Sequence, residues 1–317
     1  MMTKLNCAQW LLAHDRYLIL THRRPDGDTL GSAAVLCRGL RQLGKTAYIL
    51  ENPEITEKYR FLHQGLTKAA PVAGDTVISV DVADVGLLPD NGADLPIALR
   101  IDHHLSRRSF SEQALVDHTA GACGELIYDV LTEMGVTLDK EMAQALYTAV
   151  STDTGCFRYA NTTAHSLSVA AACAETGADL FSLNQAYFDT NSLQKLRLQG
   201  WMAENTKFFR DGQLAVCALP RRVEQALGVT EDDMENISGF PRSIEGVRMA
   251  ATLRENSDGS VKISVRAVPG YDASAVCAHF GGGGHKGAAG ATTQLSLEEA
   301  GEKIARIMEE TEKEQTL

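Results

Sequence analysis

The chain has 317 residues, of which 44% are hydrophobic, and carries a formal net charge of −11 at pH 7. This length can bury one large core or two smaller ones, and we expect two domains. The acidic balance excludes a broad basic face for long polyanions, so we expect no binding of duplex DNA, whereas short anionic ligands remain possible.

Seven cysteines are scattered along the chain without a Cys-x-x-Cys pair. An odd number of widely spaced cysteines is typical of free thiols in a reducing compartment. The amino-terminal residues do not form the basic and apolar segments of a signal peptide, and no apolar run approaches the roughly 20 residues of a membrane span. We therefore expect a cytoplasmic protein with no membrane contact.

Residues 1–190 alternate short apolar runs with longer helical patterns, which predicts an α/β domain with a mainly parallel sheet flanked by helices. The expected strands are Tyr17–Leu20, Ala47–Leu50, Val77–Val80 and Ile97–Ile101. The expected helices are Thr29–Leu43, Ala122–Met134, Lys140–Val150 and Ala164–Thr176. Open sheets of this kind carry their functional residues past the carboxyl ends of the strands.

A helix expected over residues 191–209 connects this domain to a smaller α/β domain at residues 210–317. The strands expected there are Leu214–Leu219, Val247–Arg254 and Val261–Val268. The expected helices are Glu231–Ile237, Ser274–Phe280 and Leu297–Glu310, the last of which is acidic and amphipathic. Such a pattern is typical of a surface helix.

The stretch His22-Arg23-Arg24-Pro25-Asp26-Gly27-Asp28 follows the first expected strand. Imidazole together with closely spaced carboxylates is a ligand set that suits Mn²⁺, and it lacks the thiolate that favours structural zinc. Asp26 and Asp28 could instead cap the helix that follows, and for Asp28 alone this is the better interpretation. A cap explains neither His22 nor the acid at Asp81.

Further acids and histidines follow the other elements of the first domain. Asp81 comes after the third strand, Asp102-His103-His104 after the fourth, and Asp153 after the helix that ends near Val150. Taken singly, Asp81 could be a turn residue, Asp153 could end a helix, and Asp102 could orient a histidine. Together, six candidate ligands suffice for two metal ions if one carboxylate bridges them, as in enzymes that cleave phosphorus–oxygen bonds. These are His22, Asp26, Asp28, Asp81, His103 and Asp153.

A run of four glycines, Gly281 to Gly284, precedes His285-Lys286 in the second domain. Backbone N–H groups of a glycine run can approach an anion closely, and His285 and Lys286 add donors. A flexible linker is the alternative. It accounts neither for His285-Lys286 nor for the small residues at 287–290, which favour a closely packed helix after the run.

These motifs resemble those of the DHH phosphoesterase superfamily, in the subfamily that joins a DHH domain to a DHHA1 domain. The match covers His-x-x-x-Asp-x-Asp, the single Asp, Asp-His-His and Asp-x-Gly of the first domain, and the glycine–histidine run of the second. The resemblance implies that residues 1–190 form the catalytic, metal-binding DHH domain. It also implies that residues 210–317 form a DHHA1 domain that closes over the metals and binds the nucleotide.

The resemblance implies two Mn²⁺ ions per chain, for which Mg²⁺ or Co²⁺ could substitute. His22, Asp26 and Asp81 would hold one ion, and Asp28, Asp81, His103 and Asp153 the other, with Asp81 as the bridge. His104 would contact the scissile phosphate, and Asp102 would support the histidine pair in catalysis. The expected substrate contacts are Arg158, Asn161, Ser264, Arg266, Gly283, Gly284 and His285, although Asn161 could instead cap the helix that follows.

Within the superfamily, a chain of this kind is most similar to bacterial oligoribonucleases (nano-RNases) and pAp phosphatases. The implied activity is Mn²⁺-dependent hydrolysis of short oligoribonucleotides such as pApA, or of 3′-phosphoadenosine 5′-phosphate, by attack of a hydroxide that bridges two metals. The alternatives are a cyclic di-AMP phosphodiesterase, a catalytically silent nucleotide-binding sensor and a polyphosphate phosphatase. The chain could also form a homodimer. Two departures from the family pattern, Leu105-Ser106-Arg107-Arg108 and Cys123, affect substrate preference rather than metal chemistry.

Overall fold

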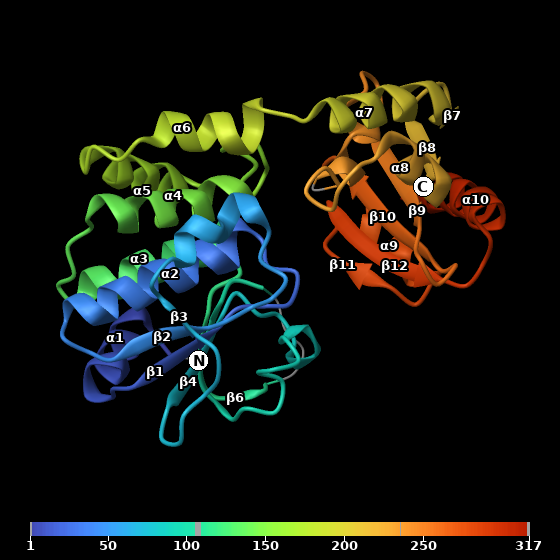
Figure 1. Ribbon diagram of the computed structural model, residues 1–317. Helices are drawn as coiled ribbons and strands as arrows, with labels where there is room; N and C mark the ends of the chain where they lie inside the picture. Colours follow the sequence, from blue (N-terminus) through green and yellow to red (C-terminus); the bar gives the residue numbers. More distant parts are fainter. Residues whose placement is uncertain (1, 105–108, 235, 316–317) are drawn as a thin grey trace. The chain divides into compact units, whose positions relative to one another are not determined.

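The computed structural model describes residues 2–104, 109–234 and 236–315 (Figure 1). The chain divides into two compact units, Met1–Thr190 and Asn191–Leu317. Within the described ranges, every helix is too short or too polar to span a bilayer.

The first unit contains a six-stranded parallel sheet with the strand order β3-β2-β1-β4-β5-β6. The strands are β1 (Tyr17–Leu20), β2 (Ala47–Leu50), β3 (Thr67–Lys68), β4 (Thr76–Val80), β5 (Ile97–Asp102) and β6 (Ser111–Val116). The predicted α/β fold with a parallel sheet is confirmed, and all four predicted strands are present. The strands β3 and β6 were not predicted, because β3 has two residues and β6 is a largely polar edge strand. Strand order reverses between β1 and β4, which is where sheets of this kind place their ligands.

The helices of the first unit cover one face of this sheet. They are α1 (Lys4–Ala13), α2 (Gly27–Gln42), α3 (Cys123–Glu133), α4 (Lys140–Asp153), α5 (Ala164–Glu175) and α6 (Leu180–Asn184). Figure 1 shows α2 and α3 next to the sheet, with α4 and α5 outside them. On the opposite face, Leu18 and Leu20 are buried under the segment of residues 82–95, which includes Val82 and Leu88. The α-helices of this unit that the structure describes therefore lie on one side of the sheet, and the segment that covers the other side contains a short 3₁₀ helix at Val85–Leu87.

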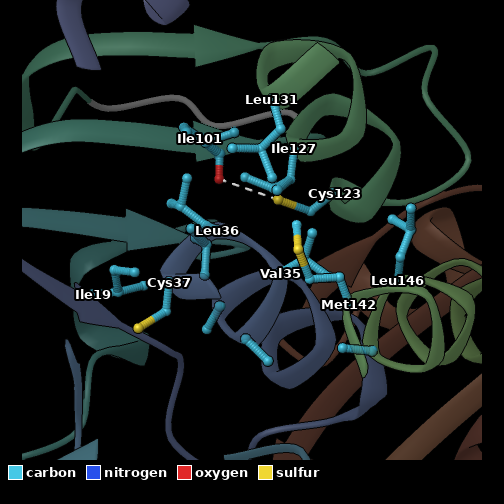
Figure 2. Close-up of a cluster of buried hydrophobic side chains, with 14 of the residues drawn as sticks. Ile19, Val35, Leu36, Cys37, Ile101, Cys123, Ile127, Leu131, Met142 and Leu146 are labelled. Atoms are coloured by element: carbon cyan, nitrogen blue, oxygen red, sulfur yellow. Dashed lines mark hydrogen bonds between the residues drawn. The ribbon is translucent and has the colours of Figure 1, made fainter. Parts of the chain in front are cut away.

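The core between the sheet and α2 and α3 includes Cys123, one of the two departures from the family pattern. Figure 2 shows its side chain among Leu36, Ile127 and Ile101, with the thiol donating a hydrogen bond to the carbonyl of Ile101 at 3.3 Å. Burial raises the pKa of this thiol well above its usual range. Cys123 is therefore an inert core residue at the start of α3. The other departure, residues 105–108, lies outside the described residues.

The helices α2 and α4 approach each other closely at Gly31. A Cβ added there would collide with the carbonyl oxygen of Ala145 and would lie 2.9 Å from the Cβ of Ala149. Only glycine fits at this crossing, because the backbone of α4 occupies the space that a side chain would need. The contact brings the first turn of α2, with Asp28, beside the last turn of α4, with Asp153.

The second unit contains a six-stranded sheet with the order β11-β12-β10-β9-β8-β7, in which only β8 and β9 pair in parallel. Its strands are β7 (Lys207–Phe209), β8 (Leu214–Leu219), β9 (Met249–Glu255), β10 (Val261–Ala267), β11 (Gly283–Gly284) and β12 (Ala288–Thr293). The helices are α7 (Leu193–Asn205), α8 (Arg221–Leu227), α9 (Ala273–Ala278) and α10 (Leu297–Gln315). One core lies between this sheet and α9 and α10, and a second joins α7 and α8 to Cys217 and Leu219 of β8.

Two helices predicted in this unit are wrong. Residues 231–234 form turns, followed by a 3₁₀ helix at Ile237–Gly239. The reciprocal bonds between Thr230 and Asp233 resemble those of a helix start, but Asn236 adopts a left-handed φ of +61°, which ends the helical conformation. The helix expected after the glycine run is instead the strand β12, paired in a hairpin with β11.

Candidate metal centre

The six candidate ligands of the first unit meet at the carboxyl ends of neighbouring strands. His22 follows β1, Asp81 follows β4, and His103 follows β5. The first turn of α2 adds Asp26 and Asp28, and the last residue of α4 is Asp153. The structure brings all six residues together in two groups, each of which offers ligand atoms within 4.8 Å of one another.

The first group is His22, Asp26 and Asp81. The Nε2 atom of His22 lies 3.5 Å from Oδ1 of Asp26 and 3.8 Å from Oδ2 of Asp81. The Nδ1 atom of His22 donates to the carbonyl of Arg23 at 2.8 Å, which directs Nε2 towards the carboxylates. Burial lowers the pKa of His22, but the two carboxylates outweigh it and raise the pKa to about 9.

The second group is Asp28, His103 and Asp153. The Nε2 atom of His103 lies 3.7 Å from Oδ2 of both aspartates, and 3.5 Å from Oδ1 of Asp81. The Nδ1 atom of His103 lies 3.1 Å from the carbonyl oxygen of Ala120. This contact orients the ring of His103, as the contact with the carbonyl of Arg23 orients the ring of His22. Asp81 therefore faces both groups, with one carboxylate oxygen towards each.

Asp28 is held by the start of α3 and does not cap α2. Its carboxylate accepts hydrogen bonds from the backbone N–H groups of Cys123 at 2.6 Å and Gly124 at 3.0 Å, and from the hydroxyl of Ser32 at 3.0 Å. The cap of α2 is Asp26, which accepts from the N–H groups of Asp28 and Thr29. The interpretation of Asp28 as a helix cap is therefore wrong.

The aspartates of the centre are crowded in the absence of a cation. Burial, followed by repulsion from Asp81 and Asp153, raises the pKa of Asp28 well above its usual range. Burial also raises the pKa of Asp81, and it raises that of Asp153 to about 7. A bound cation would remove this penalty, because it offsets both the lost hydration and the repulsion between carboxylates.

Two ligand atoms at the middle of the centre provide a direct test of whether the residues fit a metal. Oδ1 of Asp81 and Nε2 of His103 are buried, and neither has a hydrogen-bond partner among the described residues. Buried polar atoms without partners are uncommon and each costs about 1–3 kcal/mol. Asp81 is also held at a φ of +58°, a strained conformation for a non-glycine residue. Oxygen and imidazole donors of this kind form a divalent-metal centre.

His104 forms a third group of potential ligand atoms with Asp81 and His103, and its Nδ1 atom lies 3.4 Å from Oδ1 of Asp81. It also belongs to a hydrogen-bonded chain. Its Nδ1 atom and its backbone N–H both lie 3.0 Å from Oδ1 of Asp102. Oδ2 of Asp102 accepts from Nε of Arg100 at 3.0 Å and also from Nη2. Burial alone would lower the pKa of His104, but Asp102 and Asp81 together raise it to about 11.

Several residues that hold the ligands were not predicted from the sequence. Arg100 orients Asp102, Ser32 bonds to Asp28, and the amide of Asn52 donates to the carbonyl of His22 at 2.9 Å. A sequence signal existed for Asn52, which follows β2 as Asp81 follows β4. The backbone groups of Cys123 and Gly124 carry no such signal, because every residue has an N–H group.

Asn161 and Arg158 lie in the segment after Asp153. The amide of Asn161 donates to the carbonyl of Gly121 at 2.8 Å and to the carboxylate of Asp153 at 3.2 Å. The interpretation of Asn161 as a helix cap is wrong, because the cap of α5 is Thr163. Arg158 donates to the carbonyl of Gly155 at 2.7 Å. Asn161 thus contacts a candidate metal ligand directly, and its role as a substrate contact stays a prediction.

The predicted contacts of the second unit lie on or beside three paired strands. Ser264 pairs with Gly290 of β12, which pairs with Gly283 of β11. Arg266 lies two residues further along β10, on the same face as Ser264. The glycine run is an ordered hairpin rather than a linker, because His285 and Ala288 exchange backbone hydrogen bonds of 2.8 and 3.2 Å.

Comparison with known proteins bears on both units. The model of the DHH family, N-terminal domain, matches residues 16–150, and that of the DHHA1 domain matches residues 211–314. A Thermus thermophilus protein named "Bifunctional oligoribonuclease and PAP phosphatase NrnA" is 33% identical over 301 residues, which is 92% of this chain and 89% of the relative. A "Manganese-dependent inorganic pyrophosphatase" of Methanothrix thermoacetophila is 29% identical over 152 residues, or 45% of this chain and 49% of the relative.

A solved structure covers nearly the whole fold. The crystal structure of an exopolyphosphatase-related protein from Bacteroides fragilis superposes with a TM-score of 0.84 at 24% identity, covering 99% of this chain and 98% of the other. At this level of identity the likeness establishes the shared fold.

Proposed function

The chain belongs to the DHH family and is a phosphoester hydrolase, and we propose that it hydrolyses short oligoribonucleotides and 3′-phosphoadenosine 5′-phosphate with two Mn²⁺ ions per chain. The observation that carries the proposal is the buried, unpartnered pair of Asp81 Oδ1 and His103 Nε2, which lie 3.5 Å apart between two ligand groups. The names of the relatives support the substrate class and the metal.

Each ligand group would hold one ion, with Asp81 shared. His22 and Asp26 complete the first group, and Asp28, His103 and Asp153 the second. Divalent cations held there supply Lewis-acid activation of water and neutralise charge on phosphoryl oxygens.

The residues around the metal ligands supply the remaining chemistry. The side chain of His104 is 37% exposed, and in the metal-free chain the carboxylates of Asp102 and Asp81 raise the pKa of its imidazole. It is placed to donate a hydrogen bond to a phosphoryl oxygen on which negative charge increases during hydrolysis. Asp102 holds the ring through Nδ1, and Arg100 holds Asp102, so that the donor keeps its orientation.

The second unit would provide the nucleotide contacts. Ser264 and Arg266 share one face of β10, and Gly283, Gly284 and His285 form β11 and the turn after it, which β12 separates from β10. A cation and a polar hydroxyl beside exposed backbone suit a nucleotide phosphate and sugar. This arrangement supports a substrate-selecting role for the second unit and a catalytic role for the first.

A substrate panel tests the proposal. Chain stripped with a chelator is incubated with pApA, longer oligoribonucleotides, 3′-phosphoadenosine 5′-phosphate, cyclic di-AMP or polyphosphate, with and without Mn²⁺, Mg²⁺ or Co²⁺. We expect Mn²⁺-dependent turnover of pApA and of 3′-phosphoadenosine 5′-phosphate. Turnover of neither would refute the proposal, and tight binding of cyclic di-AMP without hydrolysis would favour the sensor alternative.

A further inference from the structure

The ring of Tyr159 lies flat on the backbone beside the metal centre. A Cβ added to Gly155 would lie 2.5 Å from both Cε1 and Cε2 of Tyr159, and closer still to Cζ. Equal, short distances to both Cε atoms place that position over the face of the ring, since an approach in the ring plane would lie farther from both. Gly155 is two residues after Asp153, so one face of the ring is supported by the chain that carries a candidate ligand.

A large part of Tyr159 remains accessible to solvent although Gly155 lies against one face of its ring. Tyr159 is 50% exposed, and its hydroxyl has no hydrogen-bond partner among the described residues. Tyr147 offers a contrast in the same region, because it is 6% exposed and its hydroxyl donates to Asn184 at 3.0 Å. Tyr147 also has the packing of a core residue, because its ring lies against the ring of Phe157. Tyr159 is therefore an exposed, supported aromatic surface.

The backbone that positions Tyr159 is strained. Gly155, Cys156 and Phe157 have φ angles of 58°, 57° and 61°, so that three successive residues are left-handed. For the two non-glycine residues this conformation costs about 1–2 kcal/mol each. The turn is held by hydrogen bonds from Cys156 N–H to the Ser151 carbonyl and from Tyr159 N–H to the Thr154 carbonyl. Strain of this kind persists where the surrounding structure enforces it, commonly at functional sites.

We propose that Tyr159 is a stacking platform for a nucleobase of the substrate whose phosphate is bound at the metal centre, an inference that rests on the proposed function. A base is joined to its phosphate through one sugar, so the base of a bound nucleotide falls on the surface adjoining the centre. An aromatic face stacks with any base, and each such contact contributes about 1–3 kcal/mol. The platform therefore favours nucleotides over base-free phosphate esters without selecting one base.

Steady-state kinetics with Mn²⁺ compare pApA with a 5′-phosphorylated abasic diribonucleotide, which keeps the phosphates and sugars but lacks the bases. We expect Tyr159→Ala to raise KM for pApA by roughly 10-fold with a smaller change in kcat, in line with the loss of one stacked base. For the abasic compound, KM should be similar in the variant and the original chain. Tyr159→Phe should retain most of the affinity for pApA, because stacking needs the ring and not the hydroxyl.

Two controls accompany the kinetics. Tyr48→Ala removes a partly exposed ring from β2, away from the carboxyl ends of the strands, and should leave both KM values unchanged. Melting temperature and bound Mn²⁺ of each variant establish that the centre is intact.

Equal losses of Tyr159→Ala on both compounds, no loss on pApA, or a Tyr159→Phe variant as impaired as the alanine variant would overturn the stacking role. If the original chain hydrolysed neither compound, this result would refute both the proposed function and the stacking role. These outcomes differ, since failure of stacking alone requires an active original chain.

Discussion

Replacing Asp153 by Asn should stabilise the metal-free chain and weaken the stabilisation that Mn²⁺ provides. Without a cation, burial and the neighbouring carboxylates raise the pKa of Asp153 from 3.8 to about 7. The folded chain then keeps a proton that the unfolded chain releases. This contribution to stability is complete below pH 3.8 and is lost as the pH rises towards 7. Above pH 7 the charged carboxylate is a net cost to the folded chain.

The size of that cost follows from the pKa. A change from 3.8 to about 7 corresponds to at most about 4 kcal/mol, since one pKa unit is about 1.4 kcal/mol. The side chain is 30% exposed, so screening by solvent reduces the cost to about 1–3 kcal/mol. For a unit of this size, each kcal/mol moves the melting temperature by roughly 2–4 °C. With saturating Mn²⁺ the original chain should melt higher than the variant. A ligand at about 100-fold excess over its Kd stabilises the chain that binds it by about 2.7 kcal/mol, and the variant binds Mn²⁺ less well.

The assay is thermal unfolding of both chains at pH 5 and pH 8, with a chelator and then with Mn²⁺. At pH 8 the metal-free Asp153→Asn variant should melt higher than the original chain, with a smaller difference at pH 5. Asp90→Asn, which removes the same charge from an exposed position, is the control and should show neither effect. A metal-free variant that melts lower than the original chain at pH 8 would refute the reasoning, since Asp153 would then be a stabilising helix-end residue.

Three further variants probe the centre. Asp81→Ala removes a ligand from both groups, so activity should fall by more than ~100-fold and should not recover at high Mn²⁺; recovery would mean that Asp81 is not shared. Asn161→Ala frees the carboxylate of Asp153 and should weaken Mn²⁺ binding or turnover by about 10-fold, whereas raised KM alone would indicate a substrate contact. Gly31→Ala should lower stability by about 1–3 kcal/mol and reduce Mn²⁺ binding, because it pushes α2 from α4; calorimetry with and without Mn²⁺ measures both effects.

The sequence predicted which residues the fold brings together, because parallel strands impose a simple geometry. An apolar run that ends in an acid or a histidine marks the carboxyl end of a strand, and those ends lie along one edge of the sheet. His22, Asp81 and His103 follow that rule. Asp153 and Asp28 meet through a helix crossing at Gly31, which the sequence does not mark as different from other glycines.

The groups that hold the ligands were less predictable, because most of them are backbone atoms or residues far apart in the chain. Asp28 is fixed by N–H groups almost a hundred residues later, at the start of α3. In the second unit, the glycines after Phe280 were interpreted as allowing backbone N–H groups to approach an anion, with a flexible linker as the alternative. In the structure, close packing within the hairpin explains Gly284, since a Cβ there would crowd the carbonyl of Ala288 and the backbone of Ala289, whereas a Cβ on Gly283 would meet open space.

Hydrogen bonds from other parts of the first unit hold these candidate ligands in place. In the described part of the chain, His22 and His103 are each held through Nδ1 by a backbone carbonyl, Asp28 by α3, and Asp153 by Asn161. The conformational entropy that these side chains lose on metal binding is therefore a small cost in the free energy of binding. In the metal-free chain the main cost of the centre is electrostatic, because burial removes the hydration of the carboxylates and they repel one another, and a divalent cation offsets both. Affinity for the ion and instability of the metal-free centre thus have the same origin, which is why Asp153→Asn should lower both together.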